Sequence, residues 1–488
     1  MTDVILAKLE GEGDIAKIAP PFGILYLADA LEKNGLSVKL IHEVGNEANI
    51  NALTEMVLKE APLLVGFSSI TGPSLLPTMN ASRRIKRECK VPVVWGGIHP
   101  TMLPEQTLMN DFIDIIVIGE GEETLIELVR MLREGGTNPD GLRRIAGLGF
   151  RFNGSPVITH QRPFIKNLDE LFPAWHYLDI KKYIYGGKYF YSILGSKLPG
   201  DRIAAAITSR GCPWRCGFCY NQAVNRRSFR AQSARRVIRD IQDLKSKYDI
   251  TAIVFEDDCF FTDKERALTI IREINIPWAS SIRANYLPQF GEDYVRELSR
   301  NNCIELRIGV ESGSERMLDL MKKDIHIEQL RHTVELCKKY NIKVLAGLMV
   351  GFPEESWDDV MRTLALIDEL EKENVFVSNL HIYGPWPGTP LSDLAIKHGF
   401  KAPTTIEGWS QQIWNYDQPL PPYVDKRVRY IELYRKLSIR KNSTNVSFPE
   451  RVLGHLAALR WRYRYFRFPI DAIISIFFLN ILKKLGLK

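Results

Sequence analysis

The sequence predicts an α/β protein in which an N-terminal doubly wound (Rossmann-like) parallel sheet is followed by a partial (β/α)6 TIM-type barrel and a mainly helical C-terminal region. Short apolar runs alternate with helical patterns in two separate series, which is typical of βαβ units and parallel sheets. The 488 residues are too many for one core. A composition of 45% hydrophobic and 25% charged residues is that of a folded chain and excludes wholesale disorder.

The first series covers residues 1–135 and predicts five strands, at 4–9, 37–42, 63–69, 91–97 and 114–122. A doubly wound sheet binds ligands at the carboxyl ends of its strands. Those ends read SSITGP, GGIHPT and GEGE, and their glycines would let a bulky ligand approach the backbone. The pattern alone fits ordinary strand-to-helix turns equally well.

Residues 136–200 are rich in Gly, Pro and aromatic residues and predict a linker with short strands. The second series covers residues 201–395 and predicts six strands, at 202–210, 251–258, 277–285, 304–312, 342–352 and 375–383. Six units are two fewer than a closed barrel needs. We therefore expect an open barrel with its site at the C-terminal ends of the strands.

The C-terminal region, residues 396–488, holds the net charge of the chain. From Arg451 to Lys488 there are eight Lys or Arg and one acid, Asp471, which equals the overall charge of +7 and leaves the rest of the chain neutral. A neutral body argues against a diffuse nucleic-acid-binding surface. Four arginines alternate with four aromatic residues in this tail: Arg460, Arg462, Arg464 and Arg467 with Trp461, Tyr463, Tyr465 and Phe466.

The apolar segment that follows these residues is shorter than the ~20 residues that span a bilayer. We expect either an amphipathic helix that lies in the membrane interface or a helix that packs on the core or on a second subunit. The N-terminus shows no secretory signal, which predicts a cytoplasmic protein. The basic aromatic tail adds peripheral contact with the inner face of the membrane to that prediction.

Three of the seven cysteines form the sequence CPWRCGFC, with Cys212, Cys216 and Cys219 spaced C-x3-C-x2-C directly after the first strand of the second series. Three thiolates on one loop can hold three irons of a [4Fe-4S] cluster and leave the fourth open. Zinc would need a fourth ligand at a matching spacing, and none follows. The remaining cysteines divide into three predicted buried thiols and one candidate for the site: Cys89, Cys303 and Cys337, and Cys259, which follows the acidic sequence FEDD.

This loop resembles the signature of the radical S-adenosylmethionine (SAM) superfamily, including the aromatic residue before the third cysteine. The resemblance covers about residues 200–395, with further matches at FEDD, SIRAN, GVESGSE, LMVGFPEES and YGPWPGTPL. It implies a [4Fe-4S] cluster that binds and reductively cleaves SAM. It also implies SAM-binding residues, each of which could instead be a solvated or capping residue: Phe218; Glu256, Asp257 or Asp258 for the amine; Arg283 for the carboxylate; Glu311 and Ser312 for the ribose or methionine.

Residues 1–130 resemble the cobalamin-binding domain that precedes the radical SAM domain in one large subfamily. The matches are PPFGILYLADALEKNGLSVKLI, GFSSITGP, WGGIHPTMLPE and GEGEETLIEL, in the same order. The resemblance implies bound cobalamin, with contacts from Pro21, Gly23, Ser68, Ser69, Thr71, Gly96, Gly97, His99, Gly119, Glu120 and Gly121. The sequence LIHEVG around His42 lacks the acid of the Asp-x-His-x-x-Gly motif, so no histidine ligand to cobalt is expected.

Together the two resemblances imply an enzyme, and methyl transfer to an unactivated carbon is the commonest reaction of that subfamily. Cyclisation, as in the anaerobic magnesium-protoporphyrin ester cyclase, and ring rearrangement use the same two domains. The resemblance also implies an electron donor such as flavodoxin or ferredoxin. The tail favours a lipid, isoprenoid or tetrapyrrole substrate met at a membrane surface.

Two other functions use the same residues. An RNA-modifying radical SAM enzyme would use arginine and aromatic residues to bind single strands. The neutral body and the lack of a separate RNA-binding module argue against it. A non-catalytic iron–sulfur carrier would need no SAM pocket, so the further strand-end matches argue against a carrier.

Overall fold

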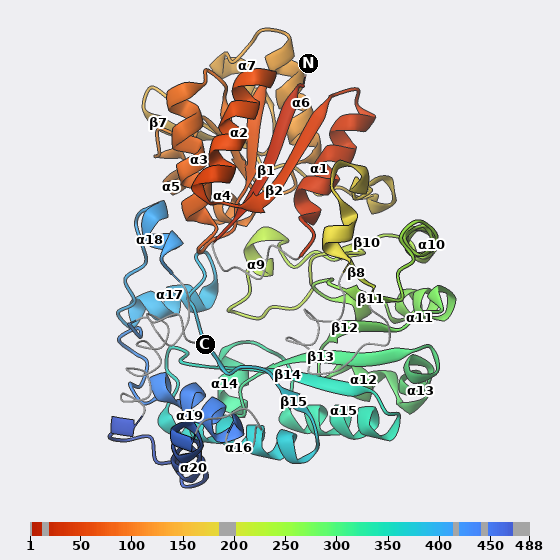
Figure 1. Ribbon diagram of the computed structural model, residues 1–488, viewed down its shortest axis with the longest axis vertical. Helices are drawn as coiled ribbons and strands as arrows, with labels where there is room; N and C mark the ends of the chain where they lie inside the picture. Colours follow the sequence, from red (N-terminus) through yellow and green to blue (C-terminus); the bar gives the residue numbers. More distant parts are fainter. Residues whose placement is uncertain (1, 12–18, 185–201, 413–418, 441–447, 472–488) are drawn as a thin grey trace.

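The computed structural model describes residues 2–11, 19–184, 202–412, 419–440 and 448–471. Figure 1 shows the N-terminal sheet, in red and orange, stacked on the open barrel, in green and cyan, with helix α9 (Asn221–Val224) between them. The carboxyl ends of both sets of strands point toward this junction. The fold therefore brings together the two strand edges at which the sequence predicts sites.

The N-terminal sheet has the strand order β2-β1-β3-β4-β5-β6-β7. Its first five strands are parallel and confirm the predicted ones: β1 (Val4–Glu10), β2 (Val38–Val44), β3 (Leu64–Ser68), β4 (Val93–Gly96) and β5 (Ile115–Val117). Alternate residues of β1 enter different cores: Leu6 packs with helices α1 (Phe22–Lys33) and α6 (Glu122–Arg133), and Ile5 with α2 (Glu47–Glu60) and α3 (Leu75–Glu88). The sheet is therefore doubly wound, with its switch point between β1 and β3.

Two strands within the predicted linker extend the N-terminal sheet. Strands β6 (Leu148–Phe152) and β7 (Ser155–Ile158) form an antiparallel hairpin on the edge of β5. Leu148 and Phe150 are buried in the core beneath α1 and α6. The predicted domain boundaries are not fixed by this pairing, and they stay a prediction.

The barrel sheet is open and parallel, as the sequence predicts. Its strand order is β15-β14-β13-β12-β11-β8, and a short strand β16 pairs with the end of β14. The strands are β8 (Ile203–Ala206), β11 (Ala252–Phe255), β12 (Trp278–Ile282), β13 (Cys303–Glu311), β14 (Lys343–Val350), β15 (Phe376–Val377) and β16 (His381–Ile382). The main covering helices are α10 (Ala234–Tyr248), α11 (Lys264–Ile274), α13 (Glu292–Arg300), α15 (Ile327–Lys339) and α16 (Trp357–Lys372). Within the described residues β8 and β15 do not pair with each other, so the sheet does not close.

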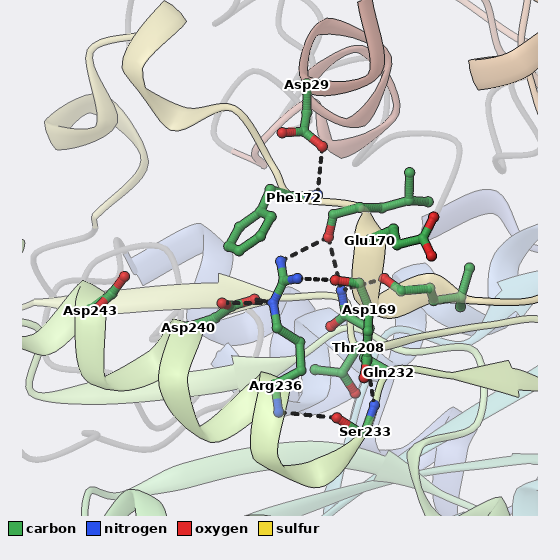
Figure 2. Close-up of polar contacts among 12 residues, drawn as sticks. Asp29, Asp169, Glu170, Phe172, Thr208, Gln232, Ser233, Arg236, Asp240 and Asp243 are labelled. Carbon is green, nitrogen blue, oxygen red and sulfur yellow. Dashed lines mark hydrogen bonds and ion pairs between the residues drawn. The ribbon is translucent and has the colours of Figure 1, made fainter. Parts of the chain in front are cut away.

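A buried arginine fastens the linker between the two domains, as Figure 2 shows. Arg236 of α10 donates to the backbone carbonyls of Asp169 and Leu171 and pairs with Asp240 at 2.8 Å. From the other side, Asp29 of α1 accepts a hydrogen bond from the Phe172 amide at 2.9 Å. The linker is thus held by both domains, which stabilises their relative orientation.

The C-terminal region covers one side of both domains. Helix α18 (Ile406–Ser410) packs against α3, and Trp409 is buried in the core of the N-terminal domain. Helices α19 (Val428–Arg440) and α20 (Phe448–Arg462) pack together beside α16 at the barrel (Figure 1). Since one segment contacts both domains, it ties the N-terminal sheet to the barrel a second time.

The basic aromatic tail packs on the barrel as far as Asp471. Arg464 and the Trp461 indole both bind Asp368 of α16, Arg460 pairs with Asp471 at 2.8 Å, and Phe466 is buried. The predicted apolar helix of residues 472–488 lies outside the described residues. Among the helices that the structure describes, none is long and apolar enough to cross a bilayer.

Candidate active site at the junction of the two sheets

The cysteine loop leaves strand β9 (Ser209–Arg210) and ends at α9. Asp258, from the end of β11, holds both ends of this loop: it accepts the Gly211 amide at 3.2 Å and the Tyr220 hydroxyl at 2.8 Å. Gly217, in the middle, donates to the Met321 carbonyl at 2.7 Å. The strand end predicted to face SAM therefore also shapes the loop that presents Cys212, Cys216 and Cys219.

Cations and amides surround the cysteine sulfurs. Arg283 donates to the Cys216 sulfur at 3.5 Å and stacks on the Trp214 ring, with its guanidinium 3.9 Å from the ring centre. Burial raises the pKa of the Cys219 thiol to about 11. In the metal-free protein this thiol therefore keeps its proton, which must leave when a metal binds.

A buried ion pair lies beside the loop at the end of β13. Lys323 binds Glu311 at 2.7 Å, and its ammonium lies 5.5 Å from the centre of the Phe218 ring. Sequence reasoning predicted Phe218, Glu311 and Arg283 here but missed Lys323, because its exposed neighbour Lys322 looks the same in the sequence. The structure thus brings two cations, Arg283 and Lys323, to one side of the cysteine loop.

The acidic strand end FEDD divides into residues that face the junction and one that does not. Glu256 and Asp258 line the cavity described below, and Glu256 pairs with Arg307 at 3.1 Å. Asp257 is buried and accepts hydrogen bonds from the Thr208 amide and hydroxyl at 3.1 and 2.9 Å. Burial raises the pKa of Asp257 to about 6. Ser312 also points inward, where its hydroxyl meets that of Thr363 at 3.1 Å.

A cavity of about 370 Å³ lies between the two sheets, within a cleft that holds about 1400 Å³ of empty space. One wall comes from the N-terminal domain and the other from the cysteine-bearing end of the barrel. The predicted cobalamin-binding residues on the first wall are Gly23, Ser68, Gly96, Gly97, Glu120, Gly119 and Gly121. The second wall includes Ser209, Arg210, Gly211, Tyr220, Glu256 and Asp258.

Glycine backbone forms much of the first wall. A side chain at Gly119 would meet nothing within 4 Å, so this backbone borders open space, and its φ of +79° favours glycine. At Gly97, with φ of +98°, a Cβ atom would lie 2.7 Å from the Ser69 carbonyl oxygen. This floor without side chains fits a broad, flat group laid against the strand ends.

The other predicted cobalamin contacts support this wall from behind. Pro21 precedes α1, and Ser69 donates to the Gly96 carbonyl at 3.2 Å. His99 is fully buried and meets the Thr71 hydroxyl at 3.0 Å, and burial lowers the pKa of His99 to about 4. His99 is therefore a neutral residue inside the fold, and it does not line the cavity.

His42, whose surrounding sequence lacks the acid of the cobalt-ligand motif, is buried in a network at the end of β2. Its ring contacts the Tyr183 hydroxyl at 2.8 Å and the Glu10 carboxylate at 3.1 Å. Both ring nitrogens are therefore engaged by protein groups.

Buried ion pairs join the two walls. Arg210, two residues before Cys212, binds Glu120 at 2.8 Å and also Glu122, and Arg230 binds Glu120 at 2.9 Å. Tyr26 of α1 donates to the Ile207 carbonyl at 3.0 Å, and its ring lies beneath Arg210. The sequence GEGE thus contributes glycine to the cavity and carboxylates to an interdomain latch, which we define as Arg210, Arg230, Glu120 and Glu122.

The residues present fit the cofactors that the sequence predicts. Three thiols on a fixed loop, with cations beside them, suit an iron–sulfur cluster and the amino acid part of SAM. The glycine floor opposite suits a macrocycle. Both face the same cleft.

The comparisons with known proteins agree with this arrangement. The radical SAM superfamily matches residues 206–367, and the B12 binding domain matches residues 13–129. An uncharacterized methyltransferase of Pyrococcus horikoshii is 30% identical over 390 residues, which are 78% of this chain and 80% of the relative. The anaerobic magnesium-protoporphyrin IX monomethyl ester cyclase of Rubrivivax gelatinosus is 25% identical over 88% of this chain and 76% of its own.

A solved structure shares the fold over the whole chain. The cobalamin-dependent SAM radical enzyme OxsB, solved with aqua-cobalamin and SAM, superposes with a TM-score of 0.69 at 18% identity, covering 100% of this chain and 76% of that one. The cofactors of these domains are a [4Fe-4S] cluster, SAM and cobalamin, and such enzymes act with a reductant on a small-molecule substrate. The chain is an enzyme that belongs to the cobalamin-dependent radical SAM family.

Proposed function

We propose that this enzyme transfers a methyl group to an unactivated carbon of a lipid, isoprenoid or tetrapyrrole-like substrate. The observation that carries the proposal is the single cleft in which the cysteine loop faces the glycine floor, since radical formation and methyl delivery must occur at one carbon. When bound, the cluster supplies the electron that cleaves SAM to a 5′-deoxyadenosyl radical, and cobalamin supplies the methyl group.

The proposal assigns roles to residues of the barrel wall. Cys212, Cys216 and Cys219 hold three irons, and Phe218 packs beneath SAM. Arg283 and Lys323 attract its carboxylate, while Asp258 and Glu256 are the acids that remain available for its amine. Asp257 and Ser312 shape the wall from behind, because their polar atoms already bind Thr208 and Thr363.

The N-terminal wall, residues 1–135 in the proposed domain division, holds cobalamin without a histidine ligand. Gly23, Ser68, Gly96, Gly97, Gly119 and Gly121 present backbone to the macrocycle. The latch fixes this wall against the barrel of residues 201–395, so that both cofactors keep one separation. The electron donor would be a low-potential protein such as flavodoxin or ferredoxin.

Peripheral contact with an anionic membrane is the second part of the proposal. Helix α20 carries a row of exposed apolar side chains at helical spacing: Val452, Leu456, Leu459 and Tyr463. Exposed basic side chains flank this row, including Arg451 and Arg462. An apolar stripe between cations favours anionic lipid. We expect the protein to sediment with phosphatidylserine vesicles at low salt, and the double variant Leu456→Asp, Leu459→Asp to stay in solution.

The test begins with anaerobic reconstitution using iron, sulfide and hydroxocobalamin. We expect about four irons and one cobalt per chain, and 5′-deoxyadenosine when SAM and a reductant are added. Lipid extract and magnesium-protoporphyrin monomethyl ester are then supplied with methyl-deuterated SAM. A deuterated methyl group in the product supports methyl transfer. Dehydrogenated or cyclised product without label would instead support cyclisation, which the similarity to the Rubrivivax cyclase favours as the second candidate.

A further inference from the structure

Cys259 lies against the cysteine loop although it is outside the C-x3-C-x2-C motif. It follows the strand end FEDD and is buried. Its sulfur is 3.4 Å from the Tyr286 hydroxyl, and its thiol is within hydrogen-bonding reach of the Cys212 thiol. Tyr286 in turn accepts a hydrogen bond from the Trp214 indole at 2.9 Å. These contacts form a chain that starts at Trp214 and returns to the loop at Cys212.

The chemistry of the four groups sets the direction of this chain. An indole N–H can only donate, so the Tyr286 oxygen accepts and its hydrogen is left for the Cys259 sulfur. Cys259 then accepts from Tyr286 and has its own S–H to donate. A cysteine that binds metal is deprotonated and can only accept. With iron on Cys212, every donor in the chain therefore points toward the cluster.

We propose that Cys259 binds no iron but donates a hydrogen bond to the Cys212 thiolate and thereby raises the reduction potential of the cluster. Hydrogen bonds to cluster sulfurs set this potential, because they stabilise the negative charge added with one electron from the reductant. The inference rests on the proposed function, since it requires the cluster on Cys212. Cys259 is thus a positioning residue that acts through Cys212.

A second donor acts on the same wall. Arg283 reaches the Cys216 sulfur at 3.5 Å and stacks on the Trp214 ring whose N–H starts the chain. The indole therefore serves two cysteines, one by stacking under the arginine and one by hydrogen bonding. Because Cys212 already occupies one corner of the cluster, a thiol beside it is placed to donate to that sulfur, and the open iron is left for SAM.

The experiment is a redox titration of the reconstituted full-length protein, followed by electron paramagnetic resonance of the reduced cluster. In Cys259→Ala we expect full iron content and a ratio of reduced to oxidised cluster, at fixed potential, that is about three- to tenfold lower. Tyr286→Phe keeps the ring, which stacks on Phe290 at 5.2 Å, and loses only the hydroxyl. It should shift the ratio in the same direction by less. Cys337→Ala, which removes a fully buried thiol of α15, is the control and should change nothing.

An unchanged potential in Cys259→Ala would overturn the inference. So would loss of iron in Cys259→Ala but not in Cys337→Ala, because Cys259 would then act in holding the cluster. Cys212→Ala tests the underlying assignment separately. Full iron content in that variant would overturn the proposed function itself, whatever the potential of the others.

Discussion

The two walls of the cleft are built from different materials. The barrel wall presents thiols, carboxylates and cations, each held by side-chain hydrogen bonds such as those of Asp258 to Gly211 and Tyr220. The N-terminal wall presents glycine backbone, with its polar side chains Ser69, Thr71 and His99 turned inward. A reactive cluster needs specific ligands, whereas a large macrocycle needs a surface of the right shape. The barrel wall should therefore be sensitive to chemistry, and the N-terminal wall to volume.

The largest effect is expected from removing a thiol of the barrel wall. Cys219→Ala should lose most of the iron and reduce SAM cleavage to background, because two cysteines cannot replace a third iron ligand. Cys89→Ala, which removes a buried thiol from the N-terminal domain, should keep both. Iron analysis and 5′-deoxyadenosine formation measure the difference. Equal iron in the two variants would mean that the cysteine loop does not hold the cluster.

The same contrast explains what the sequence could predict. The three cysteines predict their own chemistry because residue type and spacing are what a cluster requires. The strands of both sheets follow from apolar runs, and Cys89, Cys303 and Cys337 are confirmed as buried thiols. Strand ends such as FEDD predict a region but not its atoms: of its three acids, two line the cavity and Asp257 turns away.

Contacts between distant segments could not be predicted in this way. Arg210 and Glu122 are far apart in the chain, and neither belongs to a pattern that pairs it with the other. The hairpin of β6 and β7 lies in a segment whose Gly, Pro and aromatic content predicted a linker, but Leu148 and Phe150 gain burial by joining the sheet. Tertiary packing thus decides both cases.

The latch between the walls should give the next largest effect. Glu122→Gln leaves Arg210 with one carboxylate in a largely buried place and should lower the free energy of unfolding by about 3 kcal/mol. Its neighbour Glu123 pairs with Arg162 at 3.0 Å but has a side chain that is 57% exposed, against 6% for Glu122. Glu123→Gln should cost less than about 1 kcal/mol. Urea denaturation of the two variants measures this, and equal losses would show that the latch adds no stability.

A volume change on the glycine wall should follow. Gly97→Ala places a Cβ atom 2.7 Å from the Ser69 carbonyl at a φ of +98°, and should destabilise the fold by about 2 kcal/mol. Gly154, in the β6–β7 turn, also has a left-handed φ, of +78°, but a Cβ there meets nothing within 4 Å. Gly154→Ala should cost only about 1 kcal/mol and leave cobalamin binding intact. Cobalamin titration followed by absorbance separates the two, and unaltered affinity in Gly97→Ala would argue against a macrocycle on this wall.

The smallest effect concerns a carboxyl group at the mouth of the barrel. Burial raises the pKa of Glu355 to about 8, although it accepts a hydrogen bond from the Gly351 amide; Asp359 and Arg316 are its charged neighbours. The unfolded chain ionises this group near its ordinary pKa of 4.5, while the folded chain keeps the proton until about pH 8. The folded state therefore binds more protons between these values, and stability should fall as pH rises toward 8 and level off above it. Glu355→Gln resembles the protonated acid, so its melting temperature should fall less between pH 6 and 8. Parallel pH profiles for the parent and the variant would show that burial of this carboxyl group, unlike the thiols beside it, has no measurable consequence.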